Sequence, residues 1–247
     1  MNTMNNTRRS IALVGLALVV IAGCSGSKVT TKASAELSRY QIRTIALVPF
    51  TVLATPQVKD LVDPTLSAPP GFFRRSDLVM TAPLNTRQAL YQTVTVPAGA
   101  GDIVTQLLWS RLKTRQGMIV LSPGEASRAL TSQAASQSSA GQPLAMTVAK
   151  QLKADASLIG QVLVYQERVG GRFGASPPAT VGFEAKVVAA DGQVLWEGNY
   201  YEKQRPMTED LMGFIQRRGV FVTAEELATY GVEHMLDEFP FGTAVEH

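Results

Sequence analysis

The chain has 247 residues, of which 45% are hydrophobic and 17% are charged, values typical of a globular protein. Its formal net charge of +3 includes Arg8 and Arg9, and without residues 1–23 the charge is +1. This weak charge does not support nucleic-acid binding, which needs a strongly basic surface. One cysteine and two histidines are too few for an intramolecular disulfide or a Cys/His metal cluster, so we expect neither a metal nor another cofactor.

The first predicted element is a secretory signal peptide. Arg8 and Arg9 precede the uncharged, apolar residues 11–23, and the single cysteine, Cys24, follows them. A basic segment, a short apolar segment and small residues in this order are typical of signal peptides. The apolar run is shorter than the roughly 20 residues of a membrane-spanning helix. An uncleaved anchor or a short buried helix is the less favoured alternative.

Residues Ile21–Cys24 resemble the bacterial lipobox, with isoleucine in place of the usual leucine. The resemblance implies that the Cys24 sulfur receives diacylglycerol, that the signal peptide (1–23) is removed and that the new amino terminus is acylated. Two or three acyl chains attach a protein stably, whereas one chain gives only reversible binding. Ser25 stands where aspartate would resemble an inner-membrane retention signal. We therefore expect an anchor in the outer membrane, facing the periplasm, with the inner membrane as the alternative.

The anchor is followed by a predicted linker and a single domain. Residues 24–41 are small and polar and lack periodicity, so they are predicted to form a lipidated flexible tether. A single α/β domain is expected over residues 42–247, and its first buried strand covers 42–50. Residues 55–97 hold six of the thirteen prolines and are predicted to be an irregular insertion in this domain.

The remaining elements alternate between helical and extended patterns. They are expected at 102–117 (helix), 118–121 (strand), 122–130 and 143–152 (helices), 158–169, 179–190 and 193–203 (strands) and 223–238 (helix). Ser122 and Glu125 have the spacing of a helix-capping box, as do Thr223 and Glu226. The pair Asp191–Gly192 between two strands is a strong hairpin signal.

The order β-α-β-α-α-β-β-β-α predicts an α/β (α+β) fold with a mixed sheet and helices packed on it. Early strands joined through helices pair in parallel, whereas a hairpin adds antiparallel strands. The stretches "IALVPF", "MIVLSPGEASRAL" and "ADASLIGQVLVYQER" resemble the periplasmic α/β core shared by the curli secretion lipoprotein CsgG, the penicillin-binding-protein activator LpoB and the TolB N-terminal domain. The resemblance covers roughly residues 42–201. It lies in the pattern of strands and small residues and not in a characteristic set of polar residues.

Candidate catalytic residues are few. Strand alternation turns Trp196 and Tyr200 toward the core and places Glu184 and Glu197 on the opposite, solvent-facing side. Paired carboxylates can hydrolyse glycosides, but solvent exposure is the simpler explanation of these two. His234 is predicted on a helix surface, away from any nucleophile. We therefore do not expect an enzyme.

Five residues are candidates for partner binding. Arg168, Arg172 and Phe173 belong to a glycine-rich loop between two strands, and arginine and aromatic residues are common at interface hot spots. A solvated hairpin tip is the alternative. Phe72 and Phe73 lie in the predicted insertion, where they either protrude to bind or tuck into the core.

These features together predict a noncatalytic, protein-binding accessory or regulator of an envelope process. Its expected contacts are the membrane, through acyl chains on Cys24, and a periplasmic or envelope protein, as the LpoB resemblance implies. The alternative, implied by the CsgG resemblance, is an oligomeric secretion or assembly subunit. A pore needs paired spanning strands of about 9–11 residues, and the prolines of residues 55–97 count against them.

Overall fold

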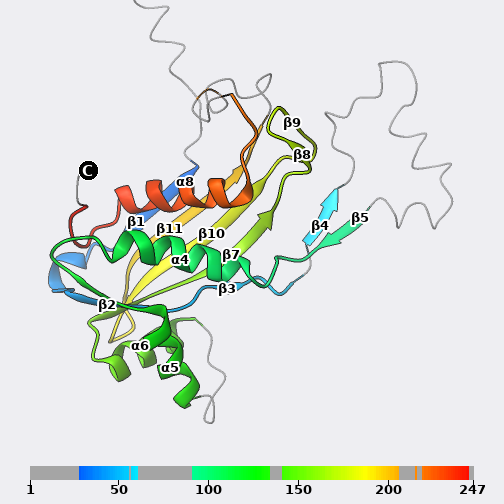
Figure 1. The fold of residues 1–247 in the computed structure, drawn as a ribbon. Helices are drawn as coiled ribbons and strands as arrows, with labels where there is room; N and C mark the ends of the chain where they lie inside the picture. Colours follow the sequence, from blue (N-terminus) through cyan, green and yellow to red (C-terminus); the bar gives the residue numbers. More distant parts are fainter. Residues whose placement is uncertain are drawn as a thin grey trace, which may run out of the picture.

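The computed structural model describes residues 28–55, 57–60, 91–133, 141–205, 215 and 219–244. Its main sheet has the strand order β1-β11-β10-β7-β2-β6, and β3 also pairs with β7 (Figure 1). The strands of this sheet are β1 (Val29–Ala33), β2 (Thr44–Leu47), β3 (Thr51–Val52), β6 (Ile119–Leu121), β7 (Ala156–Gln166), β10 (Thr180–Ala189) and β11 (Val194–Lys203). The helices are η1 (Leu37–Arg39), α4 (Ala100–Leu112), α5 (Pro123–Gln133), α6 (Gln142–Leu152) and α8 (Ala224–Asp237).

The predicted mixed sheet is confirmed. Strand β2 pairs in parallel with both β6 and β7, whereas β10 pairs antiparallel with β7 and with β11. The turn between β10 and β11 contains Asp191 and Gly192, as predicted. Gly192 has φ +99°, a left-handed conformation that favours glycine. Among the described residues, no helix is long and apolar enough to cross a bilayer.

Helices α4 and α8 cover one face of the sheet and enclose the main core (Figure 1). Trp196 and Tyr200 are each 2% exposed in this core, which confirms their predicted orientation. Helices α5 and α6 pack on the opposite face, where they bury a smaller cluster that includes Ala46, Val48 and Val148. This second layer contacts β2, β7 and β10.

Two capping boxes fix helix starts. The Thr223 hydroxyl accepts a hydrogen bond from the backbone N–H of Glu226, whose carboxylate accepts one from the backbone N–H of Thr223. Ser122 and Glu125 make the same reciprocal pair at the start of α5. Each box satisfies two donors that the first turn of a helix leaves without partners. Both predictions from residue spacing are therefore confirmed.

The predicted flexible tether, residues 24–41, requires a correction. Residues Val29–Ala33 form the edge strand β1, which pairs antiparallel with β11, and η1 follows it. Only residues 24–27 of the expected tether lie outside the described residues. Polar composition suggested a linker, but the backbone groups of this segment complete the hydrogen bonding of a distant sheet edge: Val29 pairs with Tyr200, 171 residues further along the chain. The side chains of an edge strand carry little signal of such pairing.

The predicted insertion, residues 55–97, contains some regular structure. Strands β4 (Gln57–Asp60) and β5 (Tyr91–Val94) pair antiparallel, so the segment leaves and rejoins the domain as a two-stranded ribbon. Phe72 and Phe73 lie outside the described residues.

Candidate functional site

The first described residue, Lys28, is fixed firmly to the sheet. Its carbonyl oxygen accepts a hydrogen bond from the Tyr201 backbone N–H at 3.1 Å, and its Nζ lies 3.0 Å from Oε1 of Glu202. Glu202 is only 4% exposed and also accepts a hydrogen bond of 2.8 Å from the Tyr200 hydroxyl. A buried carboxylate needs such partners because desolvation penalises its charge. The chain is thus held in place four residues after Cys24, which itself lies outside the described residues.

The predicted contact residues Arg168, Arg172 and Phe173 come together on a small hairpin at one end of the sheet. Strands β8 (Gly170–Gly171) and β9 (Gly174–Ala175) pair antiparallel and leave Arg172 and Phe173 at the turn (Figure 1). Phe173 is 91% exposed. Gly170 has φ +113°, and a Cβ there would lie 2.5 Å from the carbonyl oxygen of Gly174, so the tight pairing requires glycine.

Arg168 is different from its two neighbours, because its side chain braces the hairpin. Its Nη1 donates a hydrogen bond of 2.6 Å to the Phe221 carbonyl, and the Phe221 N–H donates one of 2.7 Å to the Arg172 carbonyl. Glu167 accepts a hydrogen bond from the backbone N–H of Ala224, at the start of α8. The hairpin is therefore tied to the segment before α8, and its exposed tip is held in a defined position.

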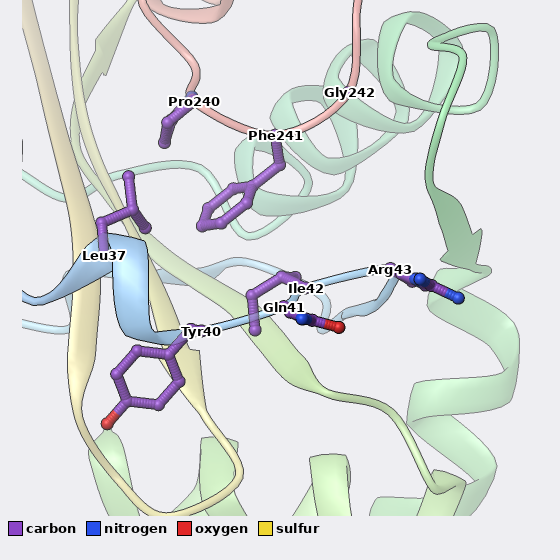
Figure 2. Close-up of a pocket in the computed structure, with 8 residues that line it drawn as sticks. All are labelled: Leu37, Tyr40, Gln41, Ile42, Arg43, Pro240, Phe241 and Gly242. Atoms are coloured by element: carbon purple, nitrogen blue, oxygen red, sulfur yellow. The ribbon is translucent and has the colours of Figure 1, made fainter.

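A groove of about 380 Å³ lies near the opposite end of the sheet (Figure 2). Its lining residues come from the segment before β2 and the segment after α8: Leu37, Tyr40, Gln41, Ile42, Arg43, Pro240, Phe241 and Gly242. Figure 2 shows the apolar side chains of Leu37, Ile42 and Phe241 around the hollow and Arg43 at its rim. The lining is more polar than apolar: Leu37, Ile42 and Phe241 supply its apolar part and Arg43 its charge, a mixture that occurs at protein contacts.

Arg115 holds the wall of this groove from behind. Its guanidinium donates hydrogen bonds to the backbone carbonyls of Phe241 (3.0 Å), Leu236 (3.2 Å), Phe239 (3.2 Å) and Gly242 (3.0 Å). It also lies 5.5 Å from the centre of the Phe239 ring, within the range of a cation–π contact. The carbonyls at a helix C-terminus have no partners inside the helix, and Arg115 satisfies one of them while fixing the segment that follows.

A hydrogen bond between side chains fixes the opposite wall of the groove, which is the segment before β2. The Tyr40 hydroxyl donates a hydrogen bond of 2.8 Å to Oδ2 of Asp191 in the turn between β10 and β11. This bond, more than any other cause, raises the pKa of Tyr40 above its ordinary value. The pKa of Asp191 is lowered, first by the backbone N–H of Gln193 and then by Tyr40. The segment that carries Ile42 and Arg43 is thereby tied to the hairpin turn.

The residues considered for catalysis lie apart from both surfaces. Glu197 pairs with Lys186 at 3.4 Å, and Glu184 faces Asn199 across the β10–β11 pair, on the side of the sheet away from the main core. His234 is exposed on α8, as predicted, and its Nδ1 lies 3.1 Å from Oδ2 of Asp237. Within the described ranges, no group of three or more metal-ligating side chains is found.

The hairpin residues could be singled out from the sequence, whereas the groove could not. Phe241 and Ile42 are separated by almost the whole length of the domain, so no local pattern brings them together. The only sequence signal at the groove is Gly242, which has φ +63° and allows the chain to turn back toward Gln116.

No protein-family model and no curated protein sequence matches this chain. Among solved structures, it is similar to the PelC dodecamer from Paraburkholderia phytofirmans, at 13% identity and a TM-score of 0.41, over 84% of this chain and 93% of that chain. The LpoB C-terminal domain from Salmonella enterica has 10% identity and a TM-score of 0.35, over 68% of this chain and 93% of that chain. Lipoprotein GNA1162 from Neisseria meningitidis has 13% identity and a TM-score of 0.34, over 71% of this chain and 96% of that chain.

Proposed function

We propose that this protein is a periplasmic lipoprotein, anchored to the outer membrane through acyl chains on Cys24, and that it acts as a noncatalytic accessory or regulator by binding an envelope protein. The apolar run, the lipobox-like residues Ile21–Cys24 and the lack of a second cysteine support acylation. The groove at the far end of the sheet supports protein binding.

The observation that carries the proposal is the position of Lys28. A chain rises by at most about 3.6 Å per residue, so the Cα atom of Cys24 lies within about 14 Å of that of Lys28. Lys28 is fixed by its bond to Tyr201 and by the buried Glu202 carboxylate. Acylation of Cys24 would therefore hold the folded domain at the bilayer surface. Glu202 would connect the lipid-bearing segment to the domain, because its buried carboxylate pairs with Lys28.

Acylation is tested by mass spectrometry of the protein purified from membranes. We expect an amino-terminal peptide that begins at Cys24 and carries diacylglycerol on sulfur and an acyl chain on nitrogen. A Cys24→Ala variant should keep residues 1–23 and lose stable membrane attachment, whereas Ser25→Ala serves as the control and should be processed normally. A mature chain with an unmodified Cys24 would refute the proposed anchor.

Protein binding is tested by crosslinking in living cells from the rim of the groove. A photoreactive residue at Arg43 should capture one envelope protein, identified by mass spectrometry. The matched control is the same residue at Arg128, an exposed arginine on α5, which should not capture that protein. Equal capture from both positions, or none from Arg43, would contradict the groove as the binding surface.

The same experiment distinguishes the alternative function. An oligomeric secretion or assembly subunit would give a ladder of crosslinked copies of this chain, with sizes that increase by one subunit. A single heterologous product favours the accessory function. Turnover of a cell-wall substrate that is lost on Glu184→Gln or Glu197→Gln would instead favour an enzyme.

A further inference from the structure

The end of the sheet that lies nearest to Cys24 also carries the exposed hairpin. Strand β1 begins at Val29, opposite Tyr200, and the register continues from Lys203 to Thr180 and Gln166, where β7 ends. The β8–β9 hairpin extends from the end of β7. Figure 1 accordingly shows the start of β1 and the hairpin at the same end of the sheet, away from α5 and α6.

The exposed side chains at this end are unusually apolar. Phe173 is 91% exposed, Val169 61% and Tyr201 59%, and these are three of the five large hydrophobic residues that are exposed among the described residues. The exposed Phe173 ring does not hold the hairpin in place, because the bonds that brace it run from the Phe221 N–H to the Arg172 carbonyl and from Arg168 to the Phe221 carbonyl. Such a side chain is suited to a surface outside the domain.

The charged side chains at this end are of both signs, with Glu225 and Glu226 exposed at the start of α8, but the tip of the hairpin itself carries only the positive Arg172. Arg172 is exposed beside Phe173, and Arg205 is exposed after β11. The acidic side chains at the ends of β7 and β11 are engaged within the protein: Glu167 accepts hydrogen bonds from the backbone N–H groups of Arg168 and Ala224, and Glu202 pairs with Lys28. An exposed arginine next to an exposed aromatic ring, as with Arg172 and Phe173, matches the phosphates and the acyl boundary of a lipid bilayer.

We propose that the β8–β9 hairpin is a second, non-covalent membrane contact, in which Phe173 enters the interface of the bilayer and Arg172 contacts lipid phosphates. The inference rests on the proposed acylation of Cys24, which brings the membrane to this end of the sheet. The short covalent distance makes a lipid surface the favoured occupant over a protein, because the bilayer lies within reach whenever the protein is anchored. Two contacts orient the domain, whereas the lipid anchor alone would let it rotate.

The test exploits the single native cysteine, whose sulfur is blocked once it is acylated. Phe173→Cys in the full-length lipoprotein provides one free thiol, which is labelled with the environment-sensitive fluorophore NBD. The control is Ile119→Cys, because Ile119 is 62% exposed on β6, at the other end of the sheet. Both proteins are reconstituted into vesicles of phosphatidylethanolamine and phosphatidylglycerol, with and without brominated acyl chains.

We expect NBD at position 173 to shift its emission to shorter wavelength on vesicles and to be quenched by the brominated lipid, while NBD at position 119 shows neither change. Thermal unfolding of both variants should match that of the wild type, because both side chains are exposed. A second variant, Arg172→Glu, should reduce the quenching at position 173 in these anionic vesicles.

The outcomes separate the two proposals. Flotation with the vesicles but a water-like emission at position 173 overturns the membrane contact and leaves the acyl anchor standing. Failure to float shows that Cys24 is not acylated, and the membrane contact then falls with the proposed anchor. Equal quenching at positions 173 and 119 overturns the defined orientation, and shielding of position 173 only by an added envelope protein overturns the lipid contact in favour of a protein interface.

Discussion

Replacement of Arg115 by methionine should destabilise the domain and open the wall of the groove. Four backbone carbonyls, at 3.0–3.2 Å, lose the guanidinium as a donor in Arg115→Met, and the Leu236 carbonyl keeps its bond from the Phe239 N–H. The methionine side chain keeps most of the apolar volume. A hydrogen bond to a charged group contributes about 1.5–3 kcal/mol when it is buried. Water can reach this partly buried site and replace some of the bonds, so we expect a total loss of about 3 kcal/mol.

The assay is urea unfolding of the purified protein, followed by circular dichroism. In thermal unfolding, measured separately, a loss of 3 kcal/mol corresponds to a fall in Tm of about 6–12 °C for a domain of this size. Arg115→Lys should lose about half as much, because an ammonium keeps the charge but lacks the planar fork that reaches several carbonyls. The same variants should weaken crosslinking from Arg43, because Phe241 and Gly242 lose their fixed position.

The control is Arg128→Met, since Arg128 is exposed and donates a single hydrogen bond to the Gly124 carbonyl, at 3.2 Å. It should change the free energy of unfolding by less than about 0.5 kcal/mol. If Arg115→Met also stays within about 0.5 kcal/mol of the wild type, the four bonds contribute nothing net and the reasoning about the groove wall is wrong.

Three further predictions concern the packing and the charges of the domain. Lys28→Met and Glu202→Gln should each lower the free energy of unfolding by about 2 kcal/mol, with a coupling of about 1 kcal/mol in the double mutant; strict additivity would contradict the ion pair. Gly231→Ala should cost about 2–3 kcal/mol in urea unfolding, because its Cβ would lie 2.3 Å from the Tyr200 ring, and an unchanged midpoint would disprove this close packing. Burial raises the pKa of Tyr165 from 10.0 to about 12. Since the folded pKa exceeds the unfolded one, stability should be intact below pH 10 and fall between pH 10 and 12, and Tyr165→Phe should reduce this fall in alkaline unfolding curves.

The order of the core elements could be predicted because its signals are local. Ser122 with Glu125, and Thr223 with Glu226, mark helix starts within four residues, and Asp191–Gly192 marks a turn. The alternation that buries Trp196 is set by the two-residue period of a strand. These signals depend on helix, strand and turn geometry that is the same in every fold. They can therefore be recognised in the sequence without knowledge of tertiary contacts.

The edge strand β1 could not be predicted, for a physical reason. The segment Val29–Ala33 contains mostly polar side chains and has one face toward solvent. Its conformation is decided by unpaired backbone groups on β11 and by the burial of Glu202, which lies 174 residues from Lys28. Local propensity is weak at such a position, and long-range pairing determines the structure.

Arg168 and Arg172 show how far residue type can be trusted at the candidate site. Both were predicted to contact a partner, and both lie on the hairpin. Arg172 contributes its backbone carbonyl, which accepts a hydrogen bond from the Phe221 N–H. Arg168 contributes its side chain, which donates a hydrogen bond to the Phe221 carbonyl. Composition and loop position were enough to single out the hairpin. They could not tell that Arg168 holds the hairpin in place while the Arg172 side chain is exposed, because this difference depends on the Phe221 carbonyl, 53 residues from Arg168.

The groove and the β8–β9 hairpin lie at opposite ends of the sheet. This separation sets the distance from the membrane at which a partner would bind the groove. Strand β7 begins near the groove and ends at the hairpin, and its 11 residues span about 33 Å at a rise of 3.3 Å per residue. With Cys24 and Phe173 both at the bilayer, Arg43 and Phe241 would face the periplasm at about that height. Because only residues 25–27 separate Cys24 from the fixed Lys28, the domain has little freedom to reach further. With the proposed anchor, a partner at the groove would have to present its own surface within about one domain length of the membrane, and an envelope protein held near the same bilayer would meet that requirement.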